Sequence, residues 1–89
     1  MKAVVSVIGK DNFGILAKVA AVCSENRANI IDVTQSVLQD MFVMVMLTEI
    51  GSLNCSFAEF SDKMKNIDGG NGLDIRVMHE DIFNSMHRI

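Results

Sequence analysis

The chain has 89 residues, a length that predicts one domain over residues 1–89. A domain of this size buries roughly 60 to 65 per cent of its unfolded surface, so association with a second chain would add to a modest stability. Half of the residues are hydrophobic and Pro, Trp and Tyr are absent, which favours a regular α/β domain over a disordered or disulfide-built one. The net charge of −3 argues against nucleic acid and anionic membranes as partners.

The cysteines and the apolar runs predict a cytoplasmic protein. Cys23 and Cys55 lie far apart and form no C-x-x-C pair, so we expect reduced thiols. No apolar run approaches the ~18 residues of a membrane span, and residues 1–2 lead directly into a strand pattern without a signal peptide.

The first third of the chain predicts a strand followed by a helix. Residues 3–8 are β-branched and apolar on both faces, apart from Ser6, which is typical of a central strand. Residues 14–26 predict a helix, because apolar side chains recur at helical spacing. Its core-facing stripe consists of Leu16, Val19, Ala20 and Cys23, widened by Ile15 and Val22.

Two further strands follow, separated by a tight polar break at Gln39–Asp40. Residues 30–38 alternate between a mostly apolar face, to which Ile31, Val33 and Val37 belong, and a polar one, so we expect a half-exposed strand. Residues 41–47 are continuously apolar and predict a buried central strand that arrives by a hairpin.

The last third predicts a helix, a strand and a short terminal helix. Ser56 and Glu59 have the spacing of a capping box, in which each side chain satisfies a backbone N–H. The apolar seam of this helix consists of Phe57, Phe60, Met64 and Ile67, and the glycine-rich residues 69–72 are expected to end it. Residues 73–77 predict a strand. Residues 81–89 predict a short helix whose inward side chains are Ile82, Phe83, Met86 and Ile89.

The order β-α-β-β-α-β with a terminal helix predicts an α+β, ferredoxin-like sandwich. Its four-stranded antiparallel sheet has the order 4-1-3-2 and carries both long helices on one face, because right-handed crossovers leave few compact alternatives. The second strand is then an edge, and its free backbone groups invite a second copy of the chain.

Several chemistries can be set aside from the residues alone. Gly9 and Gly14 have phosphate-loop spacing, but Ile15 and Leu16 stand where a lysine and a hydroxyl residue are required. Cys23 belongs to an apolar stripe, which favours a buried structural thiol over a nucleophile. We therefore predict no enzymatic activity, no metal and no cofactor.

The loop between the first strand and the first helix is the best candidate binding feature. A strand-to-helix loop leaves the first N–H groups of the helix unpaired at the positive end of its dipole, where a carboxylate is favoured. Gly14 allows close approach of a ligand, and Asp11 and Asn12 can cap the helix or contact an amino group. A plain capped helix start explains the same residues.

The loop at residues 9–16, Gly-Lys-Asp-Asn-Phe-Gly-Ile-Leu, resembles the first loop of the ACT domain family, which often reads D-R-P-G-I-L. Residues 28–32, Ala-Asn-Ile-Ile-Asp, resemble the family's start of strand two, and the resemblance spans essentially the whole chain. It implies that two domains associate through strand two, about Ile30–Leu38, with an amino acid at their interface. The resemblance implies one wall of Asp11, Asn12, Phe13, Gly14 and Ile15, and another of Asn29, Ile30 and Ile31 from the neighbouring chain.

Two departures from the family pattern matter. Phe13 replaces a frequent proline and would narrow the pocket or favour an apolar ligand side chain, so ligand identity is not transferred. Arg27 replaces a helix-ending glycine, and a left-handed arginine costs roughly 1 to 2 kcal/mol, so we expect the helix to end differently.

The resemblance and the residues together predict a homodimeric regulatory or sensor domain that binds an amino acid or similar small molecule. A metabolic enzyme or regulator is a further expected partner. The alternative is a ligand-free protein interaction module built on the same dimeric sheet.

Overall fold

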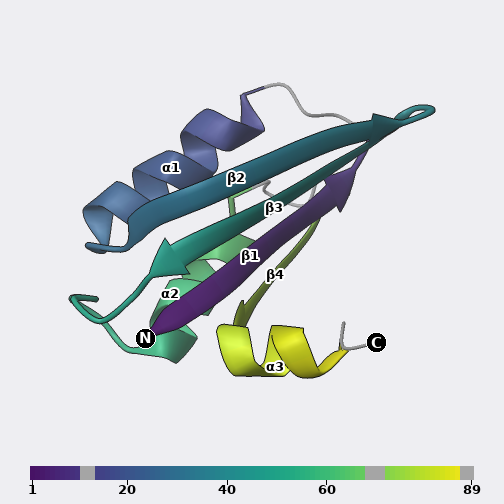
Figure 1. Cartoon of the computed structure of the whole chain (residues 1–89). Helices are drawn as coiled ribbons and strands as arrows, with labels where there is room; N and C mark the ends of the chain where they lie inside the picture. Colours follow the sequence, from purple (N-terminus) through teal and green to yellow (C-terminus); the bar gives the residue numbers. More distant parts are fainter. Residues whose placement is uncertain (11–13, 68–71, 87–89) are drawn as a thin grey trace.

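The computed structural model describes residues 1–10, 14–67 and 72–86. Its elements are β1 (Lys2–Gly9), α1 (Ile15–Glu25), β2 (Asn29–Leu38), β3 (Met41–Glu49), α2 (Phe57–Lys65), β4 (Asp74–His79) and α3 (Glu80–Met86). The four strands form one antiparallel sheet in the order β2-β3-β1-β4 (Figure 1). This is the predicted order read from the opposite edge, so the ferredoxin-like fold is confirmed.

The core lies between the sheet and the layer formed by α1 and α2. Because side chains alternate across a strand, every second residue of β1 and β3 points into this layer and is buried. β1 and β3 occupy the middle of the sheet, as their apolar composition predicts. The largest fully buried apolar side chains are Phe60, Met44, Met46, Met64, Val5, Val7 and Val19.

α2 begins at a serine cap. The Glu59 backbone N–H donates to Ser56 Oγ at 3.1 Å, which confirms the serine half of the predicted capping box. The carboxylate of Glu59 instead accepts a hydrogen bond from the Ser56 hydroxyl at 3.1 Å, so the predicted return bond to the Ser56 N–H is wrong. The predicted glycine stop falls at residues 69–71 outside the described ranges, and α2 itself ends at Lys65.

The buried stripe of α1 is narrower than predicted. Ile15, Val19 and Cys23 are buried, whereas Leu16 is 38% exposed. Leu16 follows Ile15 by one residue, a rotation of about 100° around the helix, and so lies on the flank of α1 instead of facing the sheet. The prediction that Leu16 belongs to the core is therefore wrong.

A β-bulge interrupts β2 near its start. Ile30 pairs with Thr48 and Asp32 with Leu47, so Ile31 is the extra residue between two consecutive partners on β3. Its side chain is 46% exposed. The predicted alternation, which placed Ile31 on the same apolar face as Val33, is therefore wrong because the bulge shifts the register by one residue.

The end of α1 corrects the expectation about Arg27. Arg27 is left-handed, with φ 62°. Its N–H bonds to the Ser24 carbonyl at 3.4 Å and the Ala28 N–H bonds to the Cys23 carbonyl at 2.8 Å. These two bonds are those of a Schellman motif, which requires a left-handed residue at this position. The helix thus ends as a glycine-terminated one would, and Arg27 bears a conformational cost of about 1 to 2 kcal/mol.

α3 packs on the sheet where β1 begins and β4 ends (Figure 1). Val4 alternates with the core residues Ala3 and Val5 and therefore points away from α1 and α2, yet it is only 3% exposed. α3 contacts β1 and β4 and accounts for this burial. Ile82 is 53% exposed, so its predicted inward position is wrong: two turns of helix bring only one side to the sheet.

Candidate functional site

The predicted binding residues lie at the two ends of α1. Gly14 and Ile15 stand at its start, and Asn29, Ile30 and Ile31 begin β2 just beyond its end. A helix of 11 residues is about 16 Å long at 1.5 Å per residue, so one chain does not bring the two groups together (Figure 1). The other three predicted residues, Asp11, Asn12 and Phe13, lie outside the described residues.

α1 starts at a glycine. Gly14 is the N-cap residue in a left-handed conformation with φ 70°, and it has no side chain with which to cap the helix. A Cβ at Gly14 would meet nothing within 4 Å, and no acidic residue stands in the first turn. The Ile15 side chain is only 3% exposed, so this residue has only its backbone to offer a ligand. A helix start of this kind is a favourable place for an anion, because the first N–H groups of a helix have no partner within the helix.

A cavity of about 460 Å³ opens at the other end of α1, between the helix and the start of β2. Two predicted residues, Asn29 and Ile30, belong to its lining. Arg27 also lines the cavity and was not among the predicted site residues, although it is a basic residue just beyond a helix. The complete lining is Ala20, Cys23, Ser24, Arg27, Ala28, Asn29 and Ile30.

Two features limit the chemistry of this cavity. Burial raises the pKa of the Cys23 thiol to about 11, so the thiolate needed for nucleophilic attack is scarce at neutral pH. The carbonyls of Cys23 and Ser24 accept the bonds of the Schellman motif, and the Glu25 carbonyl accepts from Asn54 Nδ2 at 3.0 Å. The carbonyls of Cys23, Ser24 and Glu25 are therefore already bonded within the chain.

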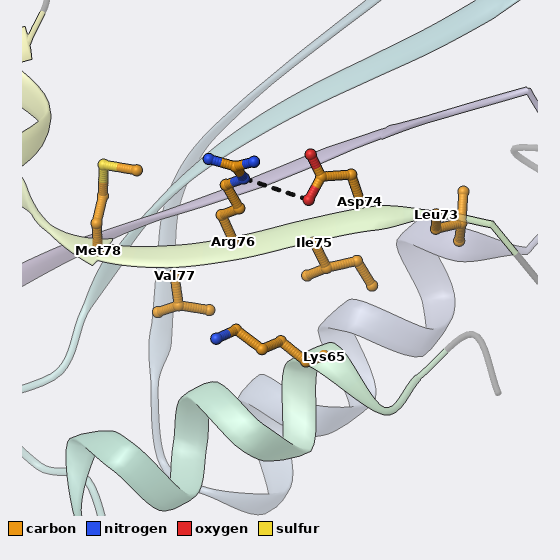
Figure 2. Close-up of a pocket in the computed structure, with 7 residues that line it drawn as sticks. All are labelled: Lys65, Leu73, Asp74, Ile75, Arg76, Val77 and Met78. Carbon is orange, nitrogen blue, oxygen red and sulfur yellow. Dashed lines mark hydrogen bonds and ion pairs between the residues drawn. The ribbon is translucent and has the colours of Figure 1, made fainter. Parts of the chain in front are cut away.

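A second cavity, of about 520 Å³, lies along β4, the edge strand opposite β2. Figure 2 shows Ile75 and Val77 pointing toward α2, while Asp74 and Arg76 lie on the opposite side of the strand. Arg76 Nε and Asp74 Oδ1 are 3.2 Å apart, so these two charges compensate each other. None of the predicted binding residues lines this cavity.

Within residues 1–10, 14–67 and 72–86, no three His, Cys, Asp or Glu side chains gather closely enough to hold a metal ion. None of the helices in those same ranges is long and apolar enough to cross a membrane.

Comparison with known proteins agrees with the fold. The sequence model of the ACT domain matches residues 2–77, and the chain belongs to the ACT domain family, whose members are ligand-binding regulatory domains. The chain is 43% identical over 89 residues to a UPF0237 protein of Clostridium perfringens, covering 100% of both chains. It is 41% identical over 88 residues to a UPF0237 protein of Methanocaldococcus jannaschii, covering 99% of this chain and 98% of the other.

A solved structure of an ACT domain protein from Streptococcus pneumoniae superposes with a TM-score of 0.78 at 29% identity. The alignment covers 98% of each chain. The whole described fold, including α3, therefore has a counterpart of similar length among solved structures.

Proposed function

We propose that this protein is a homodimeric sensor that binds an amino acid at the interface between two chains and acts without catalysis. The observation that carries the proposal is the distribution of exposed apolar side chains. Three of them gather along β2 and the neighbouring flank of α1: Leu16 at 38%, Ile31 at 46% and Val37 at 64% exposed.

Two of these side chains lie on β2 and the third lies on α1, which contacts β2. Leu16 precedes Ala20, Cys23 and Arg27 at helical spacing, and the latter three line the cavity beside the start of β2. Ile31 and Val37 belong to β2 itself, which is an edge of the sheet. An edge strand with exposed apolar residues favours pairing with a second chain, because pairing satisfies its backbone groups and buries those residues.

Antiparallel pairing of β2 with β2 of the second chain would bring the two groups of predicted binding residues together. Gly9, where β1 ends and the first loop begins, pairs with Phe42, which in turn pairs with Val37. Gly9 therefore lies at the Val37 end of β2, the start of α1 lies toward the same end (Figure 1), and Asn29 lies at the other end. An antiparallel pair with two-fold symmetry places the Asn29 end of one chain at the Val37 end of its partner. Gly14 of one chain and Asn29 of the other would then lie near each other across the interface, as a binding site formed by two chains requires.

A ligand held between two chains regulates by linkage. It favours the dimer, or one orientation of the two chains, by as much as its affinity differs between the two arrangements. An enzyme or regulator docked on the dimer would respond to that shift. The Asn29 amide offers both a donor and an acceptor and can bind a carboxylate or an ammonium group.

The test is a thermal-shift screen of the purified protein against the proteinogenic amino acids, with the oligomeric state measured by light scattering. A ligand at ~100 times its Kd adds roughly 2.7 kcal/mol, which raises the Tm of a domain this small by about 10 °C or more. We expect a selective shift that Asn29→Ala removes and that the control Asn84→Ala, on α3, retains. A folded dimer that responds to no amino acid would reject the sensor in favour of a protein interaction module.

A further inference from the structure

We propose that the guanidinium of Arg27, a residue that lines the cavity between α1 and β2, binds the carboxylate of the small-molecule ligand. This inference rests on the proposed function and deepens it, because it assigns the charged group of the site and the ligand chemistry that the site selects. The cavity has a volume of about 460 Å³ and includes Asn29 and Ile30 in its lining.

The backbone conformation of Arg27 is the first support. The helix end needs a left-handed residue here, with φ 62°, and glycine or asparagine adopts that conformation at lower cost. A side chain kept in an unfavourable conformation is characteristic of positions where the side chain has a task of its own. The Schellman motif explains why the backbone is left-handed, and it does not explain the arginine.

The lining of the cavity is the second support. Arg27 is the one charged residue among the seven that line it. Within the described ranges, none of the hydrogen bonds or ion pairs of the chain engages the Arg27 guanidinium. A guanidinium with both edges free matches the two oxygens of a carboxylate, and such charge-assisted pairs are stronger than neutral hydrogen bonds.

The neighbouring side chains define the rest of the ligand. Ala20, Cys23, Ala28 and Ile30 offer small apolar surfaces beside the guanidinium, which suits a short or medium apolar group. The Asn29 side-chain oxygen is an acceptor for an ammonium group. The ligand class is thus a carboxylic acid with an apolar side chain, and an apolar amino acid within that class.

The proposed dimer adds a second attraction for the same charge. In the proposed antiparallel pair, the start of α1 in the partner faces the Asn29 end of β2, and its N-cap residue Gly14 has no side chain. The positive end of the helix dipole at that start favours an anion. Arg27 of one chain and the helix start of the other therefore act on a carboxylate in the same direction.

The experiment uses sodium isobutyrate and isobutyramide, which have the same shape and differ in charge, added at equal ionic strength. Binding is followed by the ¹H–¹⁵N shifts of the Ser24, Ala28 and Asn29 amides. Arg27→Asn is the informative variant, because asparagine tolerates the left-handed conformation without the charge. Arg76→Asn, on the exposed edge of β4, is the matched control for loss of an arginine.

We expect isobutyrate to shift these amides in the wild type and in Arg76→Asn, isobutyramide to leave them in place, and Arg27→Asn to lose the response. For an amino acid selected by the thermal screen, we expect calorimetry to show a Kd roughly tenfold or more weaker in Arg27→Asn. Isobutyrate shifts that are absent, or that persist in Arg27→Asn, overturn the proposal.

The outcomes separate this proposal from the sensor function. If an amino acid binds the wild type and Arg27→Asn with the same Kd, the sensor function holds and the role of Arg27 is rejected. If no amino acid binds but isobutyrate shifts the amides in an Arg27-dependent way, the carboxylate site holds and the amino-acid sensor is rejected.

Discussion

Replacing Arg27 by glycine is expected to stabilise the protein in the absence of ligand. Arg27 has φ 62° because the Schellman bonds from its own N–H and from Ala28 require a left-handed residue. A residue with a Cβ pays about 1 to 2 kcal/mol in that conformation, and glycine does not.

The net gain is smaller than the strain that is removed. Glycine adds about 0.5 to 1 kcal/mol of conformational freedom to the unfolded chain, which opposes folding. We therefore expect Arg27→Gly to raise the free energy of unfolding by about 0.5 to 1 kcal/mol, equivalent to about 2 to 8 °C in Tm for a domain of this size.

The assay is urea unfolding followed by circular dichroism, without ligand, for the wild type, Arg27→Gly and Arg27→Ala. Alanine removes the guanidinium but keeps the Cβ and its strain, so we expect no gain from it. The reasoning is refuted if glycine is no more stable than alanine at this position. The same Arg27→Gly protein is expected to lose the isobutyrate response, which would separate the stability effect of this residue from its binding role.

Three further predictions concern side chains of the core and the helix caps. Asn26 is 2% exposed, donates from Nδ2 to the Val22 carbonyl at 2.8 Å and accepts from Lys63 Nζ at 2.8 Å. Asn26→Ala should therefore lower the free energy of unfolding, measured in urea, by about 2 to 3 kcal/mol. A loss below about 0.5 kcal/mol would contradict this. Burial raises the pKa of the Cys23 thiol from 9.0 to about 11, so its contribution to stability is complete below pH 9 and is lost as the pH rises toward 11. Cys23→Ala should make the free energy of unfolding less dependent on pH over that window. An unchanged slope of the free energy against pH would count against the burial of the thiol. Ser56→Ala removes the α2 cap and should cost about 1 kcal/mol, with Ser52→Ala in the preceding loop as a neutral control.

The sequence was sufficient for the strands, the helices and their order because those depend on local periodicity. The apolar residues on both faces of 3–8 and the continuous apolar run at 41–47 predicted the two central strands, and β1 and β3 lie in the middle of the sheet. The spacing of Phe60 and Met64 predicted the buried side of α2, where both are fully buried. These patterns are set by which neighbours each residue has along the chain.

The misses occur where a short segment meets the edge of the fold. Ile31 left its predicted face because a bulge inserted one residue into the β2 pairing. Leu16 and Ile82 are apolar at helical spacing, but each lies on the flank of its helix and not on the side that contacts the sheet. Periodicity alone does not show how wide the contacting side of a helix is. Leu16 and Ile31 lie on the side where a second chain is proposed, so their exposure in one chain carries information about assembly.

For the candidate site too, some features follow from the sequence and others only from the tertiary structure. By itself the sequence determined the fold class, the open glycine turn before α1, the polar start of β2 and the edge position of that strand, because each follows from residue type and order. Only the tertiary structure decided that Arg27 is left-handed and that it shares a cavity with Asn29. The physical reason is that a cavity and a helix end depend on how α1 is placed against β2, and that placement is set by packing between residues that no local pattern connects.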